Sequence, residues 1–218
     1  MYRFFTLLIL INIYFSNMVH GSGAFDHGTS TGKGKIQIDL TWNPFNYFKN
    51  GQSYIMMGYG ISEKLDIHGY YCDHSNYNNG VNSYYLGLYY QFFKSKYIDL
   101  ATAFGRRKMI DLKYGHFFFP QLLYNFKLHN DFTIGGSIVR VVNENINLYK
   151  KTENDWIAFD ITLFIPITNL IKEYENLEYI KVGIGVFRTG LINNNIDKTS
   201  FLPTYSIDIK FKTINLLK

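Results

Sequence analysis

Alternation of side-chain character with a period of two is the feature that most restricts how this chain can fold. The stretch "NSYYLGLYYQFF", residues 82–93, shows it. Successive side chains of a strand point to opposite faces. One face therefore carries hydroxyls, an amide and a glycine, whereas the other carries aromatic residues at its ends and leucines between them. A wall between lipid and a crowded polar interior would explain both faces. The apolar face reads Tyr84, Leu86, Leu88, Tyr90 and Phe92.

The same alternation recurs along the chain from residue 34 onward, and no segment shows the 3.6-residue period of a helix. Each segment approaches the roughly 9–11 residues that a tilted membrane strand needs. Aromatic residues make up 18% of the chain, with 18 glycines and only 4 prolines, which favours an all-β fold. We expect an antiparallel, up-and-down transmembrane β-barrel of about ten strands (8–12). The expected strands are 35–42, 54–61, 65–72, 82–93, 96–105, 114–128, 132–142, 156–165, 179–187 and 204–211.

The connections between these segments alternate between long and short. A long connection at 43–52 is followed by the short "SEK", and an Asn-rich one at 73–82 by "KSK". Outer-membrane barrels have short periplasmic turns and longer external loops. An even number of strands places both termini on the periplasmic side. The connection 166–178 breaks the rule, and we expect there either a brief amphipathic helix or an additional pair of strands.

The N-terminus has the order of a secretory signal. Arg3 precedes the apolar run "FFTLLILINIYF", and small residues offer cleavage after Gly21 or after Ala24. This run is too short to span a membrane as a helix. The chain thus divides into a signal peptide (1–24), an N-terminal leader (25–33), the barrel (34–212) and a C-terminal tail (213–218). Export and a barrel together predict the outer membrane of a Gram-negative bacterium.

Charge and cysteine content exclude several other classes of protein. The net charge is +5 with no run of basic residues, so we expect no nucleic-acid partner. Cys72 is alone, which excludes an internal disulfide. Histidines and carboxylates show no metal-ligand spacing, so we expect neither a metal nor a cofactor. The expected partners are outer-membrane lipid and, during biogenesis, the barrel assembly machinery.

The polar faces of the expected strands should line the lumen, and the apolar faces should meet lipid. A soluble barrel also alternates, but its outer wall usually carries many lysines and glutamates rather than glycines. Aromatic residues near the ends of the apolar faces are expected to form interfacial girdles; these are Trp42, Tyr84, Phe92, Tyr205 and Phe211. The residues expected to line the lumen are Gln37, Asp39, Asp66, His68, Tyr85, Tyr89, Gln91, Asp99, Asp160, Lys181, Asp208 and Lys210.

A barrel of this size has a narrow interior. We expect Tyr85, Tyr89 and Phe117 to fill much of it, and the aspartates to pair with Lys181, Lys210 and Lys127, because an unpaired buried charge is costly. The basic residues 106–108 are expected to open an external loop, where they would contact water or anionic lipid headgroups.

Some outer-membrane barrels are enzymes, so the possible catalytic groups need to be weighed. Asp66 and His68 share a polar face two residues apart and are the candidate base and its orienting group, with Ser137 or Ser83 as a distant nucleophile. The structural alternative is a hydrogen bond between Asp66 and His68 in a packed lumen, which we favour. The sequence has no G-x-S-x-G motif. "DHS" at residues 73–75 opens an Asn-rich connection and cannot form a triad locally.

The hairpin "GYGISEKLDIHGYY" is similar to the tight-turn hairpins of the bacterial outer-membrane β-barrel superfamily. It resembles those of outer-membrane transporters of the phenol-degradation MetA type. The last strand, "YSIDIKF", resembles the superfamily's assembly signal, although here "KTINLLK" follows the aromatic that is normally terminal. The resemblance implies a membrane barrel and names no activity.

These observations predict a non-enzymatic barrel that serves passive or selective transport of small solutes, or envelope structure. A lipid-modifying hydrolase or acyltransferase is the first alternative. A soluble secreted barrel that carries an apolar ligand is the second.

Overall fold

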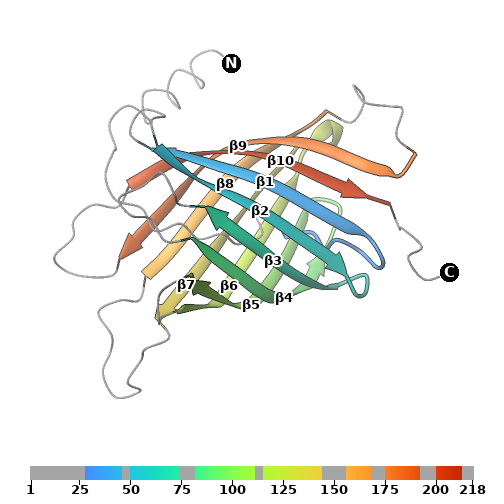
Figure 1. Cartoon of the computed structure of the whole chain (residues 1–218). Helices are drawn as coiled ribbons and strands as arrows, with labels where there is room; N and C mark the ends of the chain where they lie inside the picture. The colour runs from blue at the N-terminus through green and yellow to red at the C-terminus, as the bar shows by residue number, and fades with distance from the viewer. Residues whose placement is uncertain are drawn as a thin grey trace, which may run out of the picture.

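The chain forms a closed barrel of ten antiparallel strands (Figure 1). The computed structural model describes residues 28–45, 50–73, 82–110, 115–143, 156–167, 175–191 and 200–212. Neighbours in sequence pair throughout, and β1 pairs with β10 to close the sheet. The expected fold class is thereby confirmed. The strands are β1 (Ile36–Phe45), β2 (Asn50–Gly60), β3 (Leu65–Asp73), β4 (Ser83–Lys94), β5 (Ile98–Met109), β6 (Gly115–Lys127), β7 (Thr133–Asn143), β8 (Trp156–Pro166), β9 (Leu177–Leu191) and β10 (Ser200–Phe211).

The two ends of the barrel differ. The tight connections 61–64 and 95–97 lie at one end, together with 128–132, which holds the 3-10 turn η1 (His129–Asp131). We call this the turn end; β10 finishes there, at the right of Figure 1. The opposite end, where β3 and β4 are joined, is the loop end. The prediction of a long connection at 43–52 is wrong, because β1 and β2 extend into this range and pair as far as Phe45 and Asn50.

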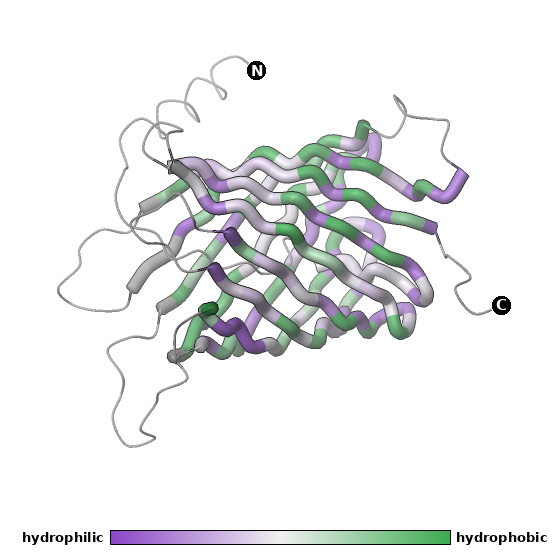
Figure 2. Tube along the Cα trace, viewed as in Figure 1, coloured by the Kyte–Doolittle hydropathy of each residue, from purple (hydrophilic) through white to green (hydrophobic). Residues whose placement is uncertain are grey.

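Side chains alternate strictly between the inside and the outside of the barrel wall. Along β4 the burial alternates residue by residue from Ser83 to Phe92, and the face that carries Tyr85, Gly87 and Tyr89 points inward. Figure 2 shows the matching alternation of hydrophobic and hydrophilic residues along the strands. On the outer face, Leu86 and Leu88 are 60% and 52% exposed. The outer surface is thus apolar, and the polar residues face inward.

Strand β6 departs from this alternation. Its pairing with β7 shifts between Phe118 and Gln121, and such a bulge changes which side chains face inward. Phe118 is fully buried, whereas Phe117 stacks on the exposed ring of Phe104 with centroids 6.2 Å apart. The prediction that Phe117 fills the lumen is therefore wrong, and Phe118 takes that place.

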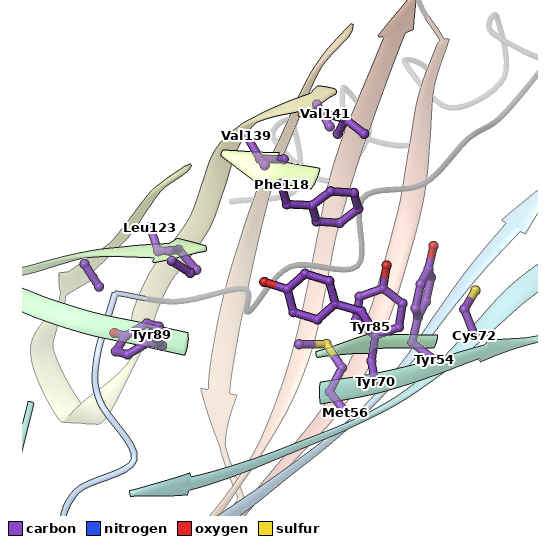
Figure 3. Close-up of a cluster of buried hydrophobic side chains, with 13 residues drawn as sticks. Tyr54, Met56, Tyr70, Cys72, Tyr85, Tyr89, Phe118, Leu123, Val139 and Val141 are labelled. Atoms are coloured by element: carbon purple, nitrogen blue, oxygen red, sulfur yellow. The ribbon is translucent and has the colours of Figure 1, made fainter. Parts of the chain in front are cut away.

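An aromatic cluster packs inside the barrel against strands β2–β6. The rings of Tyr70 and Tyr85 stack with centroids 5.0 Å apart, Tyr54 meets Tyr70 edge-on, and Phe118 lies 5.3 Å from Tyr85. Figure 3 shows the three tyrosines side by side with Phe118 beyond them. Gly105 on β5 makes room, since a Cβ there would overlap the Tyr85 ring. Glycine on the polar faces thus reflects the space that these rings occupy.

Several predictions fall on residues outside the described ranges. They are the signal peptide, the C-terminal tail, most of the connection 166–178, and the His74 and Ser75 of "DHS". Among the described residues, no helix reaches the length and apolarity of a membrane-spanning segment.

Candidate functional site

A continuous row of polar side chains runs along the inside of β1 from Gln37 to Asn43 and of β10 from Thr204 to Lys210. Its members on the two strands lie side by side in register, with Gln37 opposite Lys210 and Thr41 opposite Ser206. All are buried within the barrel. We call this row the polar track. It comprises Gln37, Asp39, Thr41 and Asn43 on β1 and Thr204, Ser206, Asp208 and Lys210 on β10.

Hydrogen bonds tie the polar track together along its length. Near the loop end, the Thr204 hydroxyl donates to Asn43 Oδ1 (2.6 Å). In the middle, the Thr41 hydroxyl donates to the Asp39 carboxylate. Toward the turn end, Asp208 accepts from Gln37 Nε2 at 3.0 Å. The neighbouring strand β9 contributes Tyr179, whose hydroxyl donates to Asp208 at 3.2 Å.

Charges of both signs meet where the polar track approaches the turn end. Asp39 and Asp208 are direct neighbours in register, and Lys181 of β9 is the partner of Asp208 on its other side. Lys210 lies 3.8 Å from the partly exposed Glu178. Because the barrel wall supplies nearly balanced charge here, the track presents no strong field of one sign.

The opposite wall of the lumen is bulky and holds the aromatic cluster. At its loop-end side, Arg107 is 2% exposed, donates to His116 Nδ1 (3.1 Å) and lies over the Phe118 ring. The prediction that residues 106–108 open an external loop is wrong, because β5 continues to Met109 and turns Arg107 inward. Little room is left for a passage along this wall.

Residues 28–33, expected to be part of a leader outside the barrel, lie across the turn end of the lumen. The Asp66 carboxylate accepts from the Thr31 backbone N–H (2.7 Å), and Asp99 accepts from the Thr29 hydroxyl (2.8 Å). Gln91 Oε1 accepts from the Ser30 hydroxyl (2.8 Å). We call residues Gly28–Lys33 the strap. Four of the residues expected to line the lumen therefore bind it: Asp66, Gln91, Asp99 and, through the Ser30 carbonyl, Lys210.

A pocket of about 200 Å³ remains beside the strap at the turn end. It lies between Thr29 of the strap and the walls formed by β6 to β10, and Lys127, Lys181 and Asp208 line it. Lys127 donates to the fully buried Asp99 at 2.7 Å. The expected pairing of Lys127 with an aspartate is thus present, and the pocket combines these charged groups with the apolar Leu128, Phe132 and Phe164.

The candidate catalytic groups have separate partners. Asp66 binds the strap, whereas His68 Nε2 forms a hydrogen bond with the Tyr85 hydroxyl (3.1 Å) and its ring stacks on Tyr85. Ser137 donates to Asp160 on the neighbouring strand β8. Ser83 is buried on β4, where it is opposite Cys72. The arrangement joins no acid, base and nucleophile into one site.

Every side chain predicted to line the lumen is buried inside the barrel except that of Lys181, which is half-buried. The predicted girdle residues lie on the outer face. Trp42 is 40% exposed and packs 6.1 Å from Tyr205, and Tyr84 and Phe92 lie near opposite ends of β4. Within the described ranges, no three His, Cys, Asp or Glu side chains come together as a metal site would require.

Sequence reasoning missed two parts of this site. The small hydroxyl residues of the polar track were passed over in favour of charged ones, although Thr41 and Ser206 occupy the same polar faces as Asp39 and Asp208. The strap was missed because "GTSTGK" has no periodicity to reveal it. Its run of short polar residues between glycines was the available signal.

No family model and no curated sequence matches the chain. Solved structures of similar architecture include the KdgM porin, at 8% identity and a TM-score of 0.44, covering 82% of this chain and 98% of that one. The N-terminal β-barrel domain of Pseudomonas aeruginosa OprF is 10% identical with a TM-score of 0.33, covering 83% and 99%. The outer membrane protease OmpT from Escherichia coli is 8% identical with a TM-score of 0.34, covering 82% and 91%. Identities this low say nothing of activity.

Proposed function

We propose that this protein spans the outer membrane of a Gram-negative bacterium and lets small polar solutes pass along the polar track. The track carries the proposal, because every lumenal side chain of β1 from Gln37 to Asn43 is polar, as is that of β10 from Thr204 to Lys210. A purely structural barrel needs a filled interior and has no need for a polar row of this length.

The outer face supports the membrane location. Large apolar side chains stand exposed on every strand that the structure describes in full, among them Ile67, Leu88 and Phe104, which lie next to one another across β3, β4 and β5. A soluble protein rarely exposes a contiguous apolar surface of this extent. Hydrocarbon would cover it, and the closed sheet satisfies the backbone hydrogen bonds as a membrane requires.

The dimensions of the interior limit what could pass. The aromatic cluster fills the side of the lumen under β2–β6, so a passage is confined to the side under β8–β10 and β1, where the buried Phe164, Phe187 and Leu202 narrow it. There the hydroxyls of Thr162 and Ser206 are buried without a hydrogen-bond partner among the described groups. Carboxylates and ammonium groups of similar number favour small polar or zwitterionic solutes over ions of one sign.

Flux through reconstituted vesicles tests the proposal. Ser206 lies in the middle of the polar track and is 3% exposed, and its neighbour Ile207 points outward and is 43% exposed. Ser206→Phe should reduce the uptake of a small neutral solute to the rate of protein-free vesicles, because the ring would occupy the track. Ile207→Phe is the matched control, and it should transport like the wild type.

The unboiled gel mobility shows whether each variant has folded. A Thr41→Leu variant serves as a second block if Ser206→Phe disturbs the packing against Gly183. Folded barrels that pass no more solute than empty vesicles, both in the wild type and in a variant whose strap has been loosened, would refute transport and leave the envelope structural role. The resemblance to transporters of the MetA type, and the barrel assembly machinery as partner, remain predictions.

A further inference from the structure

The strap is built into the turn end of the barrel by contacts with six strands. Thr29 accepts a hydrogen bond from Asn125 of β6 (2.8 Å) and donates to Asp99 of β5. The Ser30 hydroxyl and N–H both meet Gln91 of β4, and the Ser30 carbonyl accepts from Lys210 of β10 at 3.4 Å. Together with the Thr31 bond to β3 and the contact of Gly32 with β2, these bonds reach across the mouth from β10 to β6.

Glycines bring the strap this close to the wall. A Cβ on Gly28 would come within 2.5 Å of the Asp99 carbonyl, and one on Gly60 of β2 would overlap the backbone of Gly32. Gly32 and Gly34 adopt positive φ angles of 86° and 71°, and Lys35 N–H closes the turn on the Gly32 carbonyl (3.1 Å). Positive φ is readily adopted only by glycine. The chain therefore crosses the mouth, reverses direction at this turn, and enters the barrel wall as β1.

The strap obstructs the polar track where the track meets the turn end. Lys210 is the last member of the track and binds the strap through Ser30. Thr31 is 1% exposed, so the strap is tightly packed at this position. What remains open is the pocket on the other side of Thr29, which Asp208 of the track also lines. A solute that moves along the track would meet the strap at Lys210, and the strap narrows its exit to the side of this pocket.

The composition and bonding of the strap suit a segment that can be displaced from the mouth of the barrel. Its residues are glycine, serine and threonine up to the exposed Lys33, and it holds the wall by hydrogen bonds without inserting an apolar side chain. Water can replace such bonds at small net cost. The acceptors Asp66, Gln91 and Asp99 are polar and would face water in an open lumen as readily as a channel lining does.

We propose that the strap is the gate of the barrel, closing the turn end of the polar track in place and opening it when displaced. This inference rests on the proposed transport along that track. It assigns to Asp66 and Gln91 the role of holding the gate closed, in place of the catalytic role considered for Asp66.

Thr31→Pro tests the gate from the strap side, because proline removes the N–H that Asp66 accepts and leaves the wall unchanged. Solute flux into vesicles should rise about tenfold, the shift in an equilibrium that one net hydrogen bond can produce. Lys33→Ala is the matched control within the strap: Lys33 is exposed, and its loss should leave flux at the wild-type value.

Displacement of the strap is measured separately from flux. In a Cys72→Ala background, which removes the one native cysteine, Ser30→Cys places a reporter thiol on the strap, where Ser30 is 5% exposed. Maleimide should label this thiol faster when Thr31→Pro is added. If labelling does not accelerate, Asp66→Ala is measured in the same way. A strap that neither change loosens is not held by this bond, and the proposal is overturned.

The two readouts separate the gate from the transport function. Faster labelling with higher flux supports both. Faster labelling with unchanged flux, in a wild type that does transport, overturns the gate and leaves the polar track standing. Faster labelling with no flux in either protein shows that the lumen is impassable even without the strap, which overturns the proposed function as well.

Discussion

A charge placed on the outer face should destabilise the barrel only if that face lies in lipid. Leu88 stands near the middle of β4, is 52% exposed and has Ile67 and Phe104 as its neighbours across the sheet. At a bilayer midplane, an arginine on the lipid face of a barrel costs about 2–4 kcal/mol. Since about 1.4 kcal/mol corresponds to a tenfold change, Leu88→Arg should lower the folding equilibrium constant by roughly 30- to 700-fold.

The assay is equilibrium unfolding in urea with the protein inserted in lipid vesicles, read by the gel mobility of the folded barrel. Tyr97→Arg is the control: Tyr97 is 68% exposed but lies in the connection between β4 and β5 at the turn end, where the cost should be about 0–1 kcal/mol. A soluble barrel would tolerate Leu88→Arg within about 0.5 kcal/mol. That result would refute the assignment of the outer face to lipid and favour a soluble carrier.

Three further changes test the packing of the interior, each by the same unfolding measurement. Tyr85→Ala should cost about 3–5 kcal/mol because it empties the centre of the aromatic cluster, and a cost below 1 kcal/mol would contradict the stacking described. Gly105→Val should cost about 1–3 kcal/mol because the new side chain would overlap the Tyr85 ring. The double variant with Tyr85→Ala should cost less than the sum of the two single-variant costs. Strict additivity of the two costs would argue against the contact. Lys127→Ala should cost about 1–3 kcal/mol because it leaves the buried Asp99 without its cation. This is less than the roughly 3–5 kcal/mol for breaking a fully buried pair, since Lys127 is 29% exposed. Equal stability of the variant and the wild type would show that the pair contributes nothing.

Much of the wall could be predicted from the sequence because the two faces of a barrel strand require side chains of different kinds. Each side chain must suit either lipid or the lumen, so "KIQIDLTW" already shows which side of β1 is which. The aromatic ends of β4 and the glycines of the inner faces follow from the same constraint. The faces of β1 and β10 were predicted in this way, and their register then brings Asp39 beside Asp208.

The remaining features depend on contacts between distant parts of the chain. The bulge in β6 exchanges the roles of Phe117 and Phe118, and two adjacent phenylalanines give no sign of it. Strand β5 continues through Arg107 because β6 pairs with it that far and the buried His116 accepts a hydrogen bond from its guanidinium. The strap has no strand or helix pattern at all, since its position is set by hydrogen-bond partners that lie up to 180 residues away along the chain.

The measurement that tests the account most directly is the location and heat sensitivity of the native protein. Cells that express the full chain are fractionated, and each fraction is run on a gel with and without boiling. A closed barrel in the outer membrane predicts that the protein is found in the outer-membrane fraction and migrates faster when unboiled. Recovery in the soluble fraction, with the same mobility before and after boiling, would contradict it.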